Sequence, residues 1–276
     1  MNILAIAKRE IKLGWRNSWT YSFLILFTIF ITAILLLQSG VSSSEGYTDM
    51  TGTILNMTLY LLPLTTLLLG GFSATAEKED GEWDLLSTYP MSGYVFIWGK
   101  WIGLCVILFT IILFSFGFAG LLMVLFGQKV SFYSFAFYLV FALLLAFVYV
   151  SIALLIGSIV KNRWQALVTG IAIWFLMIVI WPLLMISVLS HFPSYKFIQP
   201  TLQLFTFLNP AEFIRIFTIM RMGAGSAFGA DYYEWVTWVT SSYGPMIFIL
   251  VCASWIVILV YVSGFIWERG EVNGAR

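Results

Sequence analysis

Charged residues are scarce in this sequence. Only 10% of the 276 residues are Asp, Glu, Lys or Arg, whereas 61% are apolar and 18% are aromatic. Soluble domains have about 25% charged and 45–50% apolar residues, so the composition indicates an integral membrane protein of the all-α, polytopic class. A net charge of +1 also excludes the strongly basic surface of nucleic-acid-binding domains, and we expect no nucleic-acid partner.

Residues that ligate metals or perform catalysis are equally few. His191 is the only histidine, so no histidine-based metal cluster or catalytic triad can be assembled. Cys105 and Cys252 lie in apolar runs without a partner at metal or redox spacing, which indicates small core residues. Met220 and Met222 are the only close methionine pair outside the apolar runs, and residues two apart on a helix face apart. We therefore expect no metal, no cofactor and no enzymatic activity in this chain.

Six apolar runs are long enough to cross a membrane. A helical span needs about 20 mostly apolar residues to cross about 30 Å of hydrocarbon. The runs extend from Ser18 to Leu37, Thr53 to Ala76, Trp101 to Phe126, Phe132 to Val160, Gln165 to Leu189 and Pro245 to Trp267. None of them contains Asp, Glu, Lys, Arg or His. The sequence predicts one transmembrane domain over residues 1–276, with prolines at Pro63 and Pro182 interrupting the second and fifth helices.

Lysine and arginine are distributed unequally between the two sets of connections, and the cytoplasmic set carries the excess. The ten on one side are Lys8, Arg9, Lys12, Arg16, Lys78, Lys100, Lys161, Arg163, Arg269 and Arg276. The other side has Lys129, Lys196, Arg215 and Arg221. We predict a multi-pass protein of a bacterial or archaeal cell membrane with both termini in the cytoplasm.

The first 17 residues form a separate amphipathic element. Its apolar face consists of Ile3, Ala7, Ile11 and Trp15, and its basic face of Lys8, Lys12 and Arg16. Such a pattern predicts an interfacial helix against the lipid of the inner leaflet. The alternative is a solvated basic flank that only sets the topology.

The outer connection, residues 190–243, is too long for a bare loop. Asn209 and Pro210 are a typical helix start, and Glu212 can reach back to the N-cap. The helix should run to Gly223, with Phe213, Ile216, Phe217 and Met220 on one stripe and Glu212, Arg215 and Arg221 off it. A second helix is predicted after Asp231-Tyr232-Tyr233-Glu234. Two short amphipathic helices would then lie in or over the outer leaflet, with Asn209, Pro210, Glu212 and Arg215 as candidate gate residues, unless they form a cap without a role in transport.

The run "EKEDGEWDLLSTYP" from Glu77 to Pro90 is the most acidic part of the chain. Ionisable residues within spans usually mark ion-coupled carriers. Because the apolar runs have none, transport would need energy from a separate ATP-hydrolysing subunit. We predict that residues 77–98 dock this subunit through apolar anchors with an acidic rim. The candidate residues are Glu79, Asp80, Gly81, Glu82, Trp83, Asp84, Leu85 and Leu86.

Several glycines in the apolar runs, or directly before one, favour close helix contacts. They are Gly99-x-x-x-Gly103, Gly70-Gly71 and Gly157-Ser158. The segment "GYVFIWGK" from Gly93 to Lys100 has a five-residue spacer and is followed by Trp101, so it does not fit a phosphate-binding loop. Lys100 is instead predicted to snorkel to the membrane interface beside Trp98 and Trp101.

The stretch "EKEDGEWDLLSTYPMSGYVFIWGKWIG" resembles the membrane subunit of type-2 ABC transporters, and the order of elements agrees over essentially the whole chain. Glu82 stands where that family commonly has Thr. The resemblance implies two permease copies, as a homodimer or sometimes a heterodimer, above two cytoplasmic ATPase subunits that bind ATP and magnesium. Residues 79–86 would be the coupling helix.

"LNPAEFIRI" from Leu208 to Ile216 is similar to the permeases that serve maturation of nitrous oxide reductase, a copper enzyme, with an outer accessory protein. Permeases for antibiotic or sodium efflux are less similar. Two other classes remain open: a membrane scaffold that docks a cytoplasmic protein without transport, and an intramembrane enzyme, which the lack of ionisable groups in the runs disfavours.

Overall fold

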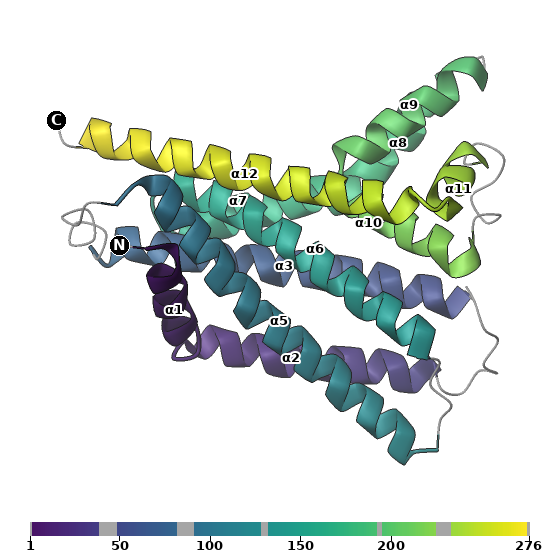
Figure 1. Ribbon diagram of the computed structural model, residues 1–276, viewed down its shortest axis with the longest axis horizontal. Coiled ribbons are helices and arrows are strands. Elements are labelled where there is room, and N and C mark those ends of the chain that lie inside the picture. Colours follow the sequence, from purple (N-terminus) through teal and green to yellow (C-terminus); the bar gives the residue numbers. More distant parts are fainter. Residues whose placement is uncertain are drawn as a thin grey trace.

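The computed structural model describes residues 2–38, 49–81, 91–127, 132–191, 195–224 and 233–274. Within these ranges the regular elements are all helices, labelled in Figure 1. They are α1 (Ile3–Gly14), α2 (Ser18–Gln38), α3 (Asp49–Glu79), α5 (Gly93–Leu125), α6 (Phe132–Ile159), α7 (Arg163–Trp174), α8 (Trp181–Leu189), α9 (Tyr195–Leu208), α10 (Pro210–Ile219), α11 (Tyr233–Thr240) and α12 (Gly244–Gly274). Two π-helical segments, η1 (Phe175–Ile180) and η2 (Met220–Ala224), continue α7 and α10.

Six helical segments of the described chain are long and apolar enough to cross a membrane, which confirms the predicted spans. They are α2, α3, α5, α6, the continuous α7–η1–α8 segment and α12. Several of these helices extend beyond the apolar runs. α3 continues to Glu79, and α5 begins at Gly93 rather than at Trp101. Glu77 and Lys100 therefore lie inside helices, near their ends, although the apolar runs themselves contain no charge.

The helices are arranged so that the two ends of the bundle differ (Figure 1). At one end, which we call the α1 end, α1 lies across the bundle, and α12 has its C-terminal part at this end as well. At the opposite end, which we call the α10 end, α10 and α11 lie beside the start of α12, and α8 and α9 project from the side. The two predicted functional regions therefore lie at opposite ends.

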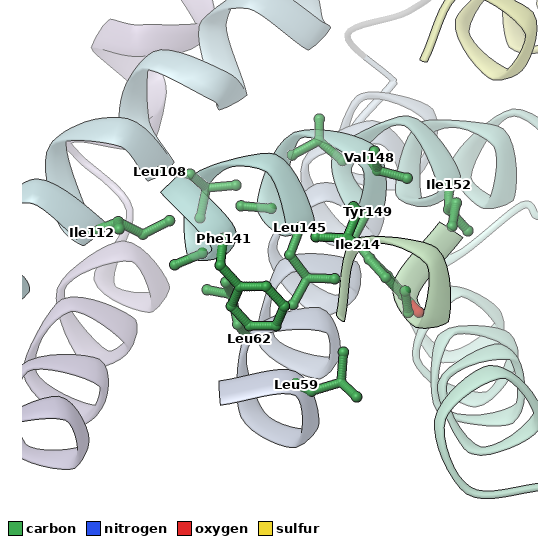
Figure 2. Close-up of a cluster of buried hydrophobic side chains, with 14 of the residues drawn as sticks. Leu59, Leu62, Leu108, Ile112, Phe141, Leu145, Val148, Tyr149, Ile152 and Ile214 are labelled. Atoms are coloured by element: carbon green, nitrogen blue, oxygen red, sulfur yellow. The ribbon is translucent and has the colours of Figure 1, made fainter. Parts of the chain in front are cut away.

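The core is formed mainly by α3, α5 and α6, which are joined by apolar side chains and by small residues. Figure 2 shows Leu62, Leu108 and Phe141 from these three helices meeting near Ile214 of α10. A Cβ atom at Gly157 would lie 2.3 Å from Cβ of Ala74. The predicted close contact at Gly157 is thus confirmed, and it brings α6 directly against α3.

The N-terminal helix α1 packs on α5 at the predicted glycine pair Gly99 and Gly103. A Cβ at Gly99 would lie 2.5 Å from Cβ of Ile6, and one at Gly103 would lie 2.6 Å from Cβ of Glu10. The buried residues of α1 are Ile6, Ala7 and Glu10. The apolar face predicted for α1 is thus only partly buried in the protein: Ala7 is buried and Ile3 is exposed, while Glu10 turns inward to an ionic partner described below.

The fifth span changes its helical geometry in the middle. The π-helical segment η1 ends directly before Trp181-Pro182. Proline has no N–H to donate, and its ring collides with the carbonyl four residues earlier. A wider π turn accommodates that ring and leaves carbonyl oxygens of the span free for other donors. Pro182 thus interrupts the regular α-helix of the fifth span.

The connection between the fifth and sixth spans contains more structure than predicted. α9 was not predicted, because Pro200 lies within it. α10 begins at Pro210 as expected, but Glu212, predicted to lie off the apolar stripe, is buried along with it. α10 packs against α6, α9, α3 and α12. The start of the second predicted helix, Asp231-Tyr232, lies outside the described residues, and α11 follows at Tyr233.

Candidate functional site

Lys100 lies at the centre of an ion cluster at the α1 end. Its Nζ atom is 2.7 Å from Oε2 of Glu10 in α1 and 3.1 Å from Oε1 of Glu77 in α3. The side chain of Lys100 is 1% exposed. The prediction that Lys100 snorkels to the membrane interface is therefore wrong, because two carboxylates from other helices meet it inside the protein.

The cluster is charge-balanced. Arg9 Nη1 lies 2.8 Å from the same oxygen of Glu77, so two cations face two carboxylates. Ser73 of α3 also donates a hydrogen bond to Glu10. Charges removed from water are tolerated when they are paired and hydrogen-bonded. The cluster therefore fastens α1 to α3 and α5, and separating these helices would expose or isolate a buried charge.

A cleft of about 370 Å³ adjoins this cluster. It lies where the turn between α1 and α2 faces α3, and Arg16, Asn17, Asp80 and Arg163 are among its lining residues. Within the described chain, Glu77 Oε2 lies beside it without a hydrogen-bond partner. Residues of α1, α2, α3, α5 and α7 line the cleft, so the ion cluster borders an open space at the end of α3.

The predicted docking residues begin directly after this cluster. Arg163, the first residue of α7, places Nε 3.2 Å from Oε2 of Glu79 and Nη2 2.8 Å from Oδ2 of Asp80. The backbone N–H of Arg163 also donates to Glu79 at 2.9 Å, and a carboxylate is stabilised at a helix N-terminus. Gly81 ends the helix in the left-handed region, with φ of 68°. The remaining predicted docking residues, Glu82, Trp83, Asp84, Leu85 and Leu86, lie outside the described residues.

Asn209 connects α10 to the fifth span. Its Oδ1 accepts hydrogen bonds from the N–H groups of Ala211 and Glu212, which confirms the predicted N-cap. Its Nδ2 donates to the carbonyl of Met177 at 2.6 Å. This carbonyl belongs to the π-helical segment η1. One side chain therefore both begins α10 and binds the irregular turn of the fifth span.

Glu212 and Arg215 form a second ion pair near the α10 end. Arg215 donates from Nε to Glu212 Oε2 at 3.0 Å and from Nη2 to Oε1 at 2.5 Å, and its Nη1 lies 3.2 Å from Oδ1 of Asn56 in α3. The expectation that Glu212 reaches back to the N-cap is not met, because the guanidinium one turn later binds both carboxylate oxygens. The pair links α10 to α3, the helix that carries Glu77 at the other end.

An aromatic cluster fills the remaining space at the α10 end. Phe217 and Phe248 stack with ring centroids 3.8 Å apart and an interplanar angle of 7°. Further ring contacts join Phe207, Phe213, Trp235 and Trp238 to this pair. The predicted gate residues Asn209, Pro210, Glu212 and Arg215 therefore belong to a packed part of the protein rather than to a loop over its surface.

Known proteins with similar sequences identify the family of this chain. A family model described as "ABC-2 family transporter protein" matches residues 4–272. The chain belongs to this ABC-2 family. The ABC transporter permease protein NosY of Stutzerimonas stutzeri is 29% identical over 232 residues, which cover 81% of this chain and 84% of the relative. NosY of Pseudomonas aeruginosa is 28% identical over 236 residues, which cover 82% and 85%.

Membership of the ABC-2 family confirms the predicted class: the chain is a multi-pass permease subunit of an ABC transporter, and such a permease has an ATPase partner.

The ion cluster around Lys100, by contrast, was not predicted from the sequence. The available signal was Glu10, which follows Ile6 by one helical turn on the face that packs on α5. A charged residue on a face that is otherwise buried indicates a partner of opposite charge inside the protein. Lys100 is the residue of α5 that carries such a charge.

Proposed function

We propose that this ABC-2 permease couples ATP hydrolysis in a separate ATPase subunit to a change at the α10 end of the bundle. The α1 end would face the cytoplasm, as the distribution of Lys and Arg indicates. Residues 77–98 would dock on the ATPase, which binds ATP and magnesium. The supporting observation is the continuity of α3: the docking acids Glu79 and Asp80 follow directly on Glu77, which is ionically bound to α1 and α5.

The proposed assembly contains a second permease copy, most simply as a homodimer, in the cell membrane of a bacterium or archaeon. Both termini would lie in the cytoplasm, and α1 would lie against lipid of the inner leaflet. The exposed face of α1 supports this placement, because Lys8 and Lys12 remain outside the contact with α5 and basic side chains favour an anionic lipid surface.

The docking step is tested by charge reversal with an internal control. The triple variant Glu79→Lys, Asp80→Lys, Glu82→Lys should lose co-purification with the ATPase and stimulation of ATP hydrolysis. Two of these changes also break the ion pairs with Arg163. Adding Arg163→Glu restores an opposite-charge pair inside the permease but not an acidic docking rim.

Both variants should therefore fail to bind the ATPase. Recovery of binding on adding Arg163→Glu would show that the acids act only within the permease. Retention of the complex by the triple variant would contradict the docking proposal altogether and would favour a scaffold that binds its cytoplasmic partner elsewhere.

We further propose that the transporter serves the maturation of a copper enzyme of the nitrous oxide reductase type, together with an outer accessory protein. The support is the similarity of "LNPAEFIRI" to permeases of that class and the two NosY relatives. Deletion of this permease should abolish the visible absorption of the copper sites in the reductase and leave tolerance to antibiotics and sodium unchanged. The opposite pattern would identify an efflux permease.

A further inference from the structure

Glu77, Lys78, Glu79 and Asp80, which we call the α3 terminal turn, contact five other helices. Successive residues of an α-helix point about 100° apart, so four of them cover the full circumference. Asp80 continues the helical pattern, since its N–H donates to the carbonyl of Ala76 at 2.8 Å. Glu77 binds α1 and α5, while Glu79 and Asp80 bind the start of α7.

Lys78 supplies the contacts to α6 and α12. Its Nζ donates to the carbonyls of Gly157, Ser158 and Val160 at 2.7, 3.0 and 2.9 Å. The last carbonyls of a helix lack intrahelical partners, and a lysine there satisfies them and opposes the negative end of the helix dipole. The same ammonium lies 4.5 Å from the ring centroid of Trp267 in α12. Lys78 therefore holds two helices that Glu77 does not reach.

The chain leaves this turn at Gly81, where the helix ends. The segment that follows is joined to the membrane domain at two points, here and at Gly93, where α5 begins and the backbone N–H donates to Glu268 of α12 at 3.1 Å. Of the two, the α3 terminal turn is the one whose side chains bind α1, α5, α6 and α7 as well as α12. On the side of α2 the turn borders the cleft described above. The five contacted helices include α6 and α12, which also pack against α10 near the other end of the bundle.

We propose that the α3 terminal turn distributes movement of the docking segment to the separate helices of the permease, and that Lys78 is the positioning residue for α6 and α12. This inference rests on the proposed function, because it requires residues 77–98 to be moved by the ATPase. Beyond that function, we infer that the movement reaches different helices through different side chains. A single substitution should therefore interrupt the movement of one helix and leave the movement of the others.

The test is hydrogen–deuterium exchange of the purified permease–ATPase complex, with and without ATP, because amide exchange reports local opening in each segment. In the wild-type complex, ATP should change exchange in residues 77–98, in the end of α6, in the end of α12 and at the start of α7. Lys78→Met should reduce the change in α6 to less than about one fifth of the wild-type value. It should lower the change in α12, which also contacts the start of α5 through Gly93 and Glu268, and should leave those in residues 77–98 and in α7. Lys78→Arg, which keeps a cationic donor, should retain all four.

Two further variants separate the branches. Arg163→Gln removes the ionic contacts to α7 but keeps the backbone N–H of residue 163 on Glu79 and leaves the docking acids in place, so the response of α7 alone should decrease. Trp267→Leu removes the ring that faces Lys78, so the response of α12 should decrease and α6 should keep its response. This variant carries the test if Lys78→Met fails to assemble.

The outcomes distinguish the two proposals. The distribution proposal is overturned if Lys78→Met or Arg163→Gln assembles with the ATPase and all four responses remain, or if all four disappear together. Absence of any ATP-dependent change in residues 77–98 of the wild-type complex would instead refute the proposed function, and with it this inference.

Discussion

Replacing Lys100 by methionine gives the sharpest test of the ion cluster. The two carboxylates lie 2.7 and 3.1 Å from Nζ. At an effective dielectric constant of about 20, these distances correspond to attractions of roughly 6 and 5 kcal/mol. Most of this attraction compensates for the free-energy cost of removing the three charges from water. Methionine keeps the approximate shape of the side chain but leaves Glu10 and Glu77 buried with Arg9 as the remaining cation.

Removing one partner of a buried ion pair destabilises a protein by about 3–5 kcal/mol. At about 2–4 °C per kcal/mol for larger chains, the melting midpoint in detergent, followed by tryptophan fluorescence, should fall by roughly 6–20 °C. Because α1 is held mainly against α5, trypsin should also cleave after Lys12 much faster. The matched control is Lys8→Met at an exposed position of the same helix, which should change stability by no more than about 0.5 kcal/mol.

Addition of Glu10→Gln to Lys100→Met should recover part of the loss, since Glu10 loses its lysine partner in the single variant whereas Glu77 keeps Arg9. The double-mutant cycle should give a coupling of about 0.5–3 kcal/mol between positions 10 and 100. A Lys100→Met protein that melts like the wild type, or a double variant whose losses simply add, would refute the assignment of a buried, stabilising cluster.

Three further predictions concern packing and the α10 end. Gly157→Leu should prevent folding or lower the yield of monodisperse protein in size-exclusion chromatography, since even a Cβ would lie 2.3 Å from that of Ala74; wild-type behaviour would show that α3 and α6 can separate. Asn209→Leu should destabilise the protein by about 1 kcal/mol or more, measured as a lower melting midpoint, because both the N-cap of α10 and its bond to the fifth span are lost, whereas Asn209→Asp should keep the cap alone. Phe217→Ala should cost about 3–5 kcal/mol through the cavity left beside Phe248, and a loss below about 1 kcal/mol would mean that the aromatic cluster relaxes around the gap.

The spans and their close contacts could be predicted because they depend on local properties. The length of an apolar run determines whether a helix can cross the membrane, and this gave all six spans. The cap at Asn209 depends on three consecutive residues, and the contacts at Gly99 and Gly157 follow from missing side chains. Each of these signals lies within a few positions of the chain.

The ion cluster could not be predicted by the same means. Lys100 meets Glu10, which is distant in the sequence, and its own neighbours Trp98 and Trp101 are typical of a membrane interface. The inward position of Glu10 in α1 could not be predicted for the same reason, since hydrophobicity alone does not direct a carboxylate toward a partner on another helix. The burial of α10 depends on its packing among other helices, which its amphipathic sequence does not show.

The unequal burial of the spans has a consequence for biosynthesis. The α6 window is 67% buried, whereas the fifth-span window is 6% buried. At about 5–20 residues per second, the ribosome needs roughly 6–23 s to synthesise residues 160–276, which follow α6. The tightly packed unit of α3, α5 and α6 can therefore assemble in the membrane before the later spans are inserted, and α12, made last, then covers a surface of α5 and α6 that is already folded.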